Sequence, residues 1–109
     1  MGSYNISTSI GQIDISFEGA FTPENAQNFV KDFKTEVTKV NPATCHLVLD
    51  GTRLAISPAQ MVDLLRNCFA MYQGMGFKRI TMNPGSNVVL RMQVSRLAKE
   101  AGLTGFELK

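Results

Sequence analysis

Two runs of alternating residues at the start of the chain constrain its fold more than any other feature of the sequence. Residues 4–10 alternate Tyr, Ile, Thr and Ile with Asn and Ser, and residues 13–18 alternate Ile, Ile and Phe with Asp, Ser and Glu. A period of two predicts β-strands that cover one face and leave the other to solvent. The residues between the runs, Gly11 and Gln12, predict a hairpin closed by a type II′ turn that has glycine first.

Three later segments repeat apolar residues at helical spacing, and each carries start or stop signals of a helix. Residues 22–40 begin with a threonine cap followed by proline, and residues 57–74 begin with a Ser-Pro-Ala-Gln capping box at Ser57. Residues 86–101 are followed by Gly102, which suits the end of a helix. The three segments therefore predict three helices.

The intervening segments predict strands and, with the hairpin, a fold class. Residues 45–49 suit a strand buried on both faces of a parallel sheet, and the more polar residues 77–82 suit a strand nearer an edge. Phe106 and Leu108 suit a short closing strand. The order predicts a single α/β domain over residues 1–109, with a mixed sheet of four to five strands, an N-terminal hairpin and about three packing helices.

Composition narrows the classes of protein to which the chain can belong. With 44% hydrophobic and 18% charged residues, the 109-residue chain has ordinary globular usage, which excludes a disordered protein. No apolar run is long enough for a membrane span, and no secretory signal is visible. Cys45 and Cys68 lack Cys-x-x-Cys spacing and lie in apolar stretches, which predicts buried free thiols in a reducing cytoplasm.

Charge is distributed unevenly along the chain, although the net charge is only +2. Acidic side chains outnumber basic ones in residues 1–50, and basic side chains outnumber acidic ones in residues 51–109. Such a division can steer an acidic partner toward one face. It has no such effect if the two halves of the sequence interleave in space, and the sequence leaves both alternatives open.

No catalytic or cofactor-binding constellation is visible, so the sequence predicts a protein that is not an enzyme. The one histidine, His46, lies in an apolar strand, where a hydrogen-bonded core residue is favoured over a base. One histidine and two scattered cysteines are too few for a zinc site, and no glycine-rich phosphate loop occurs. The basic residues of the third helical segment lack interleaved aromatic residues, which argues against nucleic-acid binding.

Polar residues follow two of the predicted parallel strands at their carboxyl ends. Asp50, Thr52 and Arg53 follow the first strand, and Asn83 and Ser86 follow the second. Ligands of open α/β sheets bind at this edge, where helix N-termini also favour an anion. The alternative is that the serines at the helix starts only cap their helices.

The element order and several local patterns resemble the STAS family, the fold of the anti-sigma factor antagonists. The resemblance covers nearly the whole chain and is carried by the apolar strand that ends at Asp50, the cap at Ser57, and the strand, turn and helix of residues 77–103. In that family a Ser or Thr at the start of the second helix is phosphorylated by a partner kinase, and its state controls docking. The resemblance places the phosphoacceptor at Ser57, although the sequence around it is Ala-Ile-Ser-Pro-Ala where the family has a pattern close to Asp-Ser-Ser-Gly.

These observations lead to one functional prediction and one alternative. The resemblance implies a non-enzymatic interaction module whose partner is a protein, such as an anti-sigma or kinase-like protein, bound at the edge that carries Thr52, Arg53, Ser57 and the second helical segment. The alternative is a domain that binds a small anionic or apolar ligand at the same edge. Neither reading requires a cofactor or a metal.

Overall fold

A computed structural model describes residues 2–20, 22–55, 58–86, 88–103 and 105–109. Within these residues the chain forms five strands, three α-helices and one short 3₁₀ helix. In chain order they are β1 (Ser3–Ser9), β2 (Gln12–Ala20), α1 (Pro23–Val37), η1 (Pro42–Thr44), β3 (His46–Ala55), α2 (Pro58–Met75), β4 (Arg79–Asn83), α3 (Val88–Glu100) and β5 (Phe106–Leu108).

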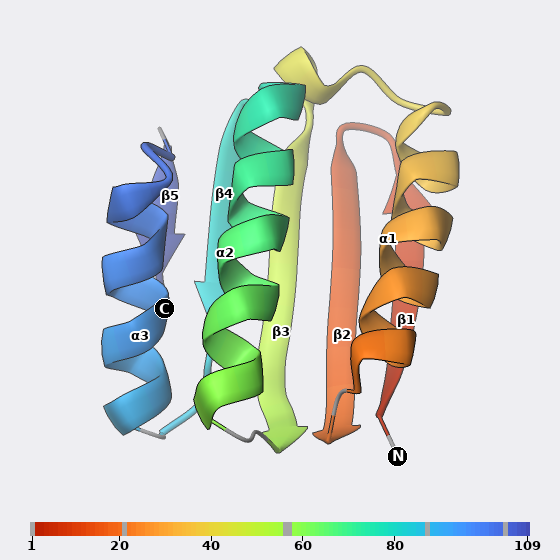
Figure 1. Ribbon diagram of the computed structural model, residues 1–109. Coiled ribbons are helices and arrows are strands. Elements are labelled where there is room, and N and C mark those ends of the chain that lie inside the picture. Colours follow the sequence, from red (N-terminus) through yellow and green to blue (C-terminus); the bar gives the residue numbers. More distant parts are fainter. Residues whose placement is uncertain (1, 21, 56–57, 87, 104) are drawn as a thin grey trace.

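The strands form one mixed sheet in the order β1-β2-β3-β4-β5 (Figure 1). The β1–β2 pair is antiparallel, and the three pairs that follow are parallel. This confirms the predicted α/β class, the N-terminal hairpin and the short closing strand. Since β3 lies at the centre and β4 lies one strand from the end, the relative placement predicted for these two strands is also confirmed.

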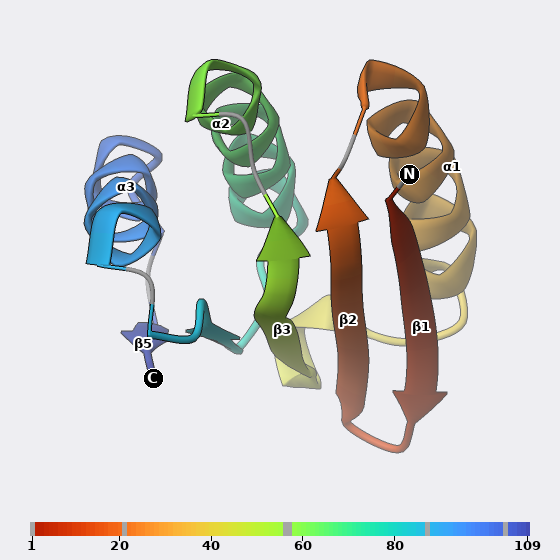
Figure 2. The same cartoon turned by 90° about the horizontal axis from the view of Figure 1, so that it is seen from below.

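All three helices lie on one face of this sheet, as Figure 2 shows from below. Each parallel connection moves one strand further in the same direction across the sheet. Because such connections are right-handed, the helices that form them must fall on the same side. The single core of the described residues therefore lies between one face of the sheet and α1, α2 and α3.

The one-sided packing corrects the prediction for the central strand. In β3, Leu47 and Leu49 are 0% and 2% exposed, whereas the alternate residues His46 and Val48 are only half-buried. The prediction that this strand is buried on both faces is wrong, because no helix of the described chain covers the face on which His46 and Val48 lie.

Polar side chains pair across the strands on the uncovered face. The imidazole Nε2 of His46 lies 2.6 Å from the Thr81 hydroxyl, and the Arg79 guanidinium donates to the Glu107 carboxylate at 2.7 Å. Thr81 is 3% exposed although it belongs to this face, because its neighbours on both adjacent strands surround it. The hydrogen bond predicted for His46 is confirmed, but its predicted place in the core is wrong, because His46 is half-buried on the uncovered face.

The hairpin turn also differs from its prediction. Ser9 pairs with Gln12, so the two loop residues are Ile10 and Gly11 rather than Gly11 and Gln12. Gly11 has φ +74° and no described residue other than glycine has a positive φ, which makes the turn type II rather than type II′. The side chain of Ile10 consequently projects from the turn and is fully exposed.

The ends of the helices follow the capping residues closely. The Thr22 hydroxyl accepts the backbone N–H of Asn25, whose side-chain oxygen accepts the backbone N–H of Thr22. α1 ends at Val37 rather than near residue 41, and η1 forms separately. α2 continues through Gly74 and ends before Gly76, which has φ +72°.

Aromatic rings connect the two edges of the sheet through the core. Phe29 and Phe33 of α1 stack at 5.6 Å between ring centroids, and Phe33 meets Tyr72 of α2 edge to face at 5.4 Å. Phe29 and the aromatic residues of α2 continue the row to the first and last strands through three further ring pairs: Tyr4–Phe29, Phe69–Tyr72 and Phe69–Phe106. Offset and edge-to-face pairs of this kind add to the stabilisation from apolar burial.

A matched pair of truncations tests the one-sided core. Leu47→Ala should lower the free energy of unfolding by about 2–5 kcal/mol, because it leaves a cavity among buried side chains. Val48→Ala, one residue along the same strand, should cost less than half as much because Val48 is only half-buried. Urea unfolding of both variants measures the difference, and equal losses would contradict the assignment of the two faces.

Candidate functional site

The predicted edge of the sheet lies at the carboxyl end of β4 and at the residues of β3 from Asp50 onward. Asp50 and Asn83 are register partners on these strands, and the turn at Gly85 packs against Thr52. The arrowheads of β3 and β4 and the starts of α2 and α3 meet on this side of the molecule (Figure 1). The structure therefore brings Asp50, Thr52, Asn83 and the segment before α3 together, as predicted from the sequence.

The segment after Asp50 is extended rather than a loop, which corrects one expectation. β3 continues to Ala55 because the nine-residue strand β2 supplies partners beyond Asp50: Glu18 pairs with Arg53 after an irregularity that follows Ser16. Asp50 and Thr52 thus lie on a strand, and the Asp50 side chain makes a turn-like contact with Thr52 at the edge.

The Asp50 carboxylate accepts two hydrogen bonds from Thr52. Its carboxylate accepts the backbone N–H of Thr52 at 3.0 Å and the Thr52 hydroxyl at 2.7 Å. These bonds, the backbone one first, lower the pKa of Asp50 below 3.8, and the positive charge of Arg53 acts in the same direction. The carboxylate is therefore ionised and committed to Thr52 at neutral pH.

Asn83 makes the equivalent contact on the neighbouring strand. Its side-chain oxygen accepts the backbone N–H of Gly85 at 3.0 Å, and the Gly85 carbonyl accepts from the Arg91 guanidinium of α3 at 3.0 Å. Gly85 has φ +76°, and a Cβ there would lie 3.4 Å from the Cα of Thr52. Glycine is favoured because any other residue would be strained at this positive φ, and the space left beside β3 is only enough for ordinary contact.

The other predicted site residues occupy different positions. The Arg53 side chain is exposed, and this residue pairs with β2 rather than β4. Ser86 is exposed and lies two residues before the first residue of α3, Val88. Ser57, the predicted phosphoacceptor, lies outside the described residues.

The histidine and the two cysteines, which are the side chains that most often act in catalysis, lie away from this edge, and each is either hydrogen-bonded or buried. His46 is four residues before Asp50 on β3, about 13 Å away along a strand, and it is bonded to Thr81. Cys45 and Cys68 are buried free thiols, as predicted; burial raises the pKa of Cys45 and raises that of Cys68 to about 12. Among the described residues no group of three or more His, Cys, Asp and Glu side chains is placed to hold a metal ion.

An exposed apolar cluster adjoins the edge and was missed from the sequence. Val88, Val89 and Met92 in the first turns of α3 are 67%, 60% and 68% exposed. The inward face of the same helix is formed by Leu90, Val94, Leu97 and Ala98. The signal was available, because Val88, Val89 and Met92 are apolar and fall outside the inward stripe, but a count of apolar residues at helical spacing does not separate the two sets. We call these three residues the α3 apolar cluster.

None of the helices, over the residues that the structure describes, is both long and apolar enough to cross a membrane.

Comparison with known proteins identifies the fold. No protein-family model matches the sequence, and no curated protein matches it. Among solved structures, the chain is similar to an uncharacterised protein from the DUF3478 family with a SpoIIAA-like fold from Shewanella loihica PV-4. The similarity has a TM-score of 0.66 and 17% sequence identity, and it covers 99% of this chain and 85% of that one. The chain therefore has a SpoIIAA-like fold, the fold of the anti-sigma factor antagonists, and the resemblance seen in the sequence is confirmed at the level of the fold.

The pKa of Asp50 provides a test of the local structure at the edge. Thr52→Val removes the hydroxyl donor but keeps the backbone donor, so the pKa of Asp50 should rise toward 3.8 without reaching it. Thr52→Ser, which keeps the hydroxyl, should leave it low. NMR titration of the carboxyl carbon measures both variants, and an unchanged pKa in Thr52→Val would contradict the assigned cause.

The same contact makes a contribution to stability whose pH dependence has a definite sign. Because the pKa of Asp50 is lower in the folded state than in the unfolded chain, the contact stabilises the protein above the ordinary pKa of 3.8. Its contribution is lost as the pH falls through the lowered value.

Proposed function

We propose that this protein is a non-enzymatic interaction module that binds a protein partner through the α3 apolar cluster and the adjoining carboxyl ends of β3 and β4. The observation that carries the proposal is the exposure of Val88, Val89 and Met92 side by side on one helix. Contiguous exposed apolar side chains rimmed by polar ones are typical of protein-binding surfaces.

The rim beside this cluster is pre-ordered. Thr52, Gly85 and Arg91 are fixed by hydrogen bonds or by backbone contact, so the polar groups around the cluster keep their positions before binding. A surface that is already ordered loses less conformational entropy on association than a mobile one. The hydrogen bonds that Asp50 and Asn83 accept from residues two positions later therefore order the docking surface and do not serve catalysis.

The charges near the cluster define the chemistry of the partner. Arg53 at the edge and Arg96 and Lys99 further along α3 are exposed cations. The starts of α2 and α3 on the same side add the positive ends of two helix dipoles. A partner with an apolar ridge and acidic residues beside it, such as an acidic amphipathic helix, complements this surface.

An interaction role also accounts for the state of the reactive groups. The thiols are buried with raised pKa values, and His46 is hydrogen-bonded at the other end of β3. Asp50 is bonded to Thr52 and is remote from any described histidine. General acid–base or nucleophilic catalysis requires such groups to converge on one point, and in the described structure they do not.

Substitution of the cluster tests the proposal directly. Val89→Gln with Met92→Gln keeps good helix-forming residues while removing exposed apolar surface, so stability should change by no more than about 0.5 kcal/mol per site. Affinity for a partner captured from cells of the source organism, and then purified, should fall about tenfold or more. Isothermal titration calorimetry measures the loss.

Ile10→Gln is the matched control, because it removes an even more exposed apolar side chain from the hairpin turn at the opposite end of the sheet. It should bind the partner like the wild type. Equal binding by the double variant and the wild type would overturn the proposed surface. A melting temperature raised by a phosphate, nucleotide or fatty acid, and lowered binding of that molecule on Arg53→Gln, would favour the ligand-binding alternative instead.

We further propose Ser57 as the phosphoacceptor that controls docking, on the basis of the sequence resemblance and of its position immediately before the first residue of α2, Pro58. A phosphate at a helix N-terminus is favoured by the helix dipole and adds negative charge to the surface that carries Arg53, Arg96 and Lys99. It should therefore reduce the affinity for an acidic partner.

Intact-mass analysis of protein from its source cells should show a phosphorylated fraction that Ser57→Ala abolishes. Ser57→Asp, which can still cap a helix, should weaken partner binding, whereas Ser57→Ala should cost about 1 kcal/mol of stability and leave binding unchanged. Unmodified protein, together with equal partner binding by both variants, would remove the switch and leave the docking surface standing.

A further inference from the structure

The two edges of the sheet differ in how they are protected. β5 is a three-residue edge strand whose Glu107 forms an ion pair with Arg79, and short, charged edges resist pairing with other chains. β1 at the other edge is seven residues long, Ser3–Ser9, and its sequence SYNISTS contains no charged residue and no proline. Its only neighbour in the described sheet is β2, so its other side is an edge of that sheet. This edge lacks the charged residues, proline and short length that usually keep an edge strand from pairing with another strand.

A groove of about 300 Å³ runs along this edge between β1 and α1. Its floor and wall are three consecutive strand residues and three residues on one face of the helix: Tyr4, Asn5 and Ile6 from β1, and Asp32, Thr35 and Glu36 from α1. Figures 1 and 2 both place α1 alongside β1. A groove between an edge strand and a helix is the geometry in which an extended peptide adds to a sheet.

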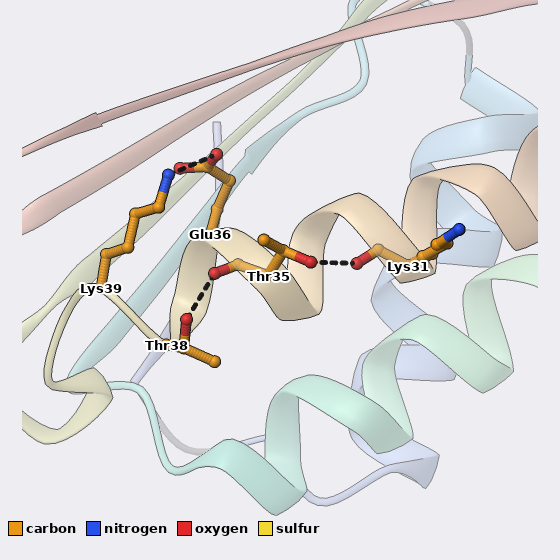
Figure 3. A network of polar contacts seen from close by, with 5 residues as sticks. All are labelled: Lys31, Thr35, Glu36, Thr38 and Lys39. Atoms are coloured by element: carbon orange, nitrogen blue, oxygen red, sulfur yellow. Dashed lines mark hydrogen bonds and ion pairs between the residues drawn. The ribbon is translucent and has the colours of Figure 1, made fainter.

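The helix wall of the groove carries two carboxylates. Asp32 accepts the hydroxyl of Tyr4, a contact that raises the pKa of Tyr4 to about 12 and ties the middle of α1 to the edge strand. Glu36 forms an ion pair with Lys39 at 3.2 Å (Figure 3). The Lys39 side chain is 60% exposed, so this pair is weak and an incoming cation can compete for the carboxylate.

The hydroxyl between these carboxylates is already used within the helix. Thr35 donates to the backbone carbonyl of Lys31, and Thr38 donates to that of Thr35 (Figure 3). The wall therefore offers acceptors, from Asp32 and Glu36, rather than donors. An extended strand that lies in the groove would present every second side chain toward this wall.

We propose that β1 accepts an extended segment of another protein with lysine or arginine at alternate positions, which adds to the sheet as a sixth strand. Backbone hydrogen bonds to β1 give affinity, and the basic side chains over Asp32 and Glu36 give specificity. A second copy of this chain is disfavoured as the occupant, because it would bring another Asp32 and Glu36 to the junction. This site lies at the opposite edge from the α3 apolar cluster and does not rest on the function proposed above.

The probe is an eight-residue peptide of alternating threonine and lysine with both ends blocked. Titrated into the ¹⁵N-labelled protein, it should shift the amide signals of Ser3–Ser9 and of α1 around Asp32, and leave those of the α3 apolar cluster unchanged. The peptide with glutamate in place of lysine should not bind. Two further peptides, N-methylated on the threonines or on the lysines, separate strand addition from simple charge attraction, since only one of the two directs its N–H groups toward β1.

Asp32→Asn and Glu36→Gln should each weaken binding of the lysine peptide about two- to fivefold, as expected for exposed ion pairs, and Asp32→Asn keeps an acceptor for Tyr4. Glu24→Gln, in the first turn of α1 and outside the groove, is the matched control and should bind like the wild type. The proposal is overturned if the lysine peptide leaves the β1 signals unmoved, or if both N-methylated peptides bind equally. It is also overturned if the protein alone sediments as a dimer that Ile6→Lys disrupts, which would make the occupant a second copy.

Discussion

The contact between Phe33 of α1 and Tyr72 of α2 joins the two halves of a row of aromatic rings on which the arrangement of the elements depends. The row starts at Tyr4 on the first strand and ends at Phe106 on the last. Because right-handed connections place every helix on the same face of the sheet, the buried apolar core can form only on that face. Phe33 and Tyr72 are 0% and 2% exposed and lie between the two helices, so their contact fixes the spacing of α1 and α2 over the central strands.

Local signals in the sequence were sufficient to predict the helices and strands, but not to predict which faces of the strands the helices cover. The cap at Thr22 and the glycine stop at Gly102 are governed by hydrogen bonds and φ angles within a few residues, and the structure has them where the sequence placed them. The burial of β3 depends on where helices distant in the sequence pack, so the prediction that both faces of this strand are buried was wrong, and Val48 is only half-buried. The same holds for the extension of β3 past Asp50, which exists because β2 is long enough to pair with it.

The position of the candidate site could be predicted from the sequence, but the contacts that its residues make could not. Parallel strands bring Asp50 and Asn83 to one edge by topology alone, and the register confirms it. Each side chain accepts a hydrogen bond from the backbone N–H two residues later in the chain. Asp and Asn side chains are short, which favours such local bonds over contacts with a ligand. The exposed residues of α3 escaped detection for a different reason: Val89 and Leu90 are both apolar, and a count of apolar residues does not reveal that one lies on the inward stripe and the other outside it.

A sheet covered on one side leaves few places where another molecule can gain binding energy. On the uncovered face the polar side chains pair with one another, as His46 does with Thr81 and Arg79 with Glu107, so that face has little left to offer. What remains is apolar surface at the start of α3 and backbone along β1, and these lie on opposite flanks of the aromatic row. The two surfaces also differ in charge, with cations beside α3 and the carboxylates of Asp32 and Glu36 beside β1. Because β1 and α3 lie at opposite ends of the sheet, the two proposed surfaces do not overlap, and one partner would not block the other sterically.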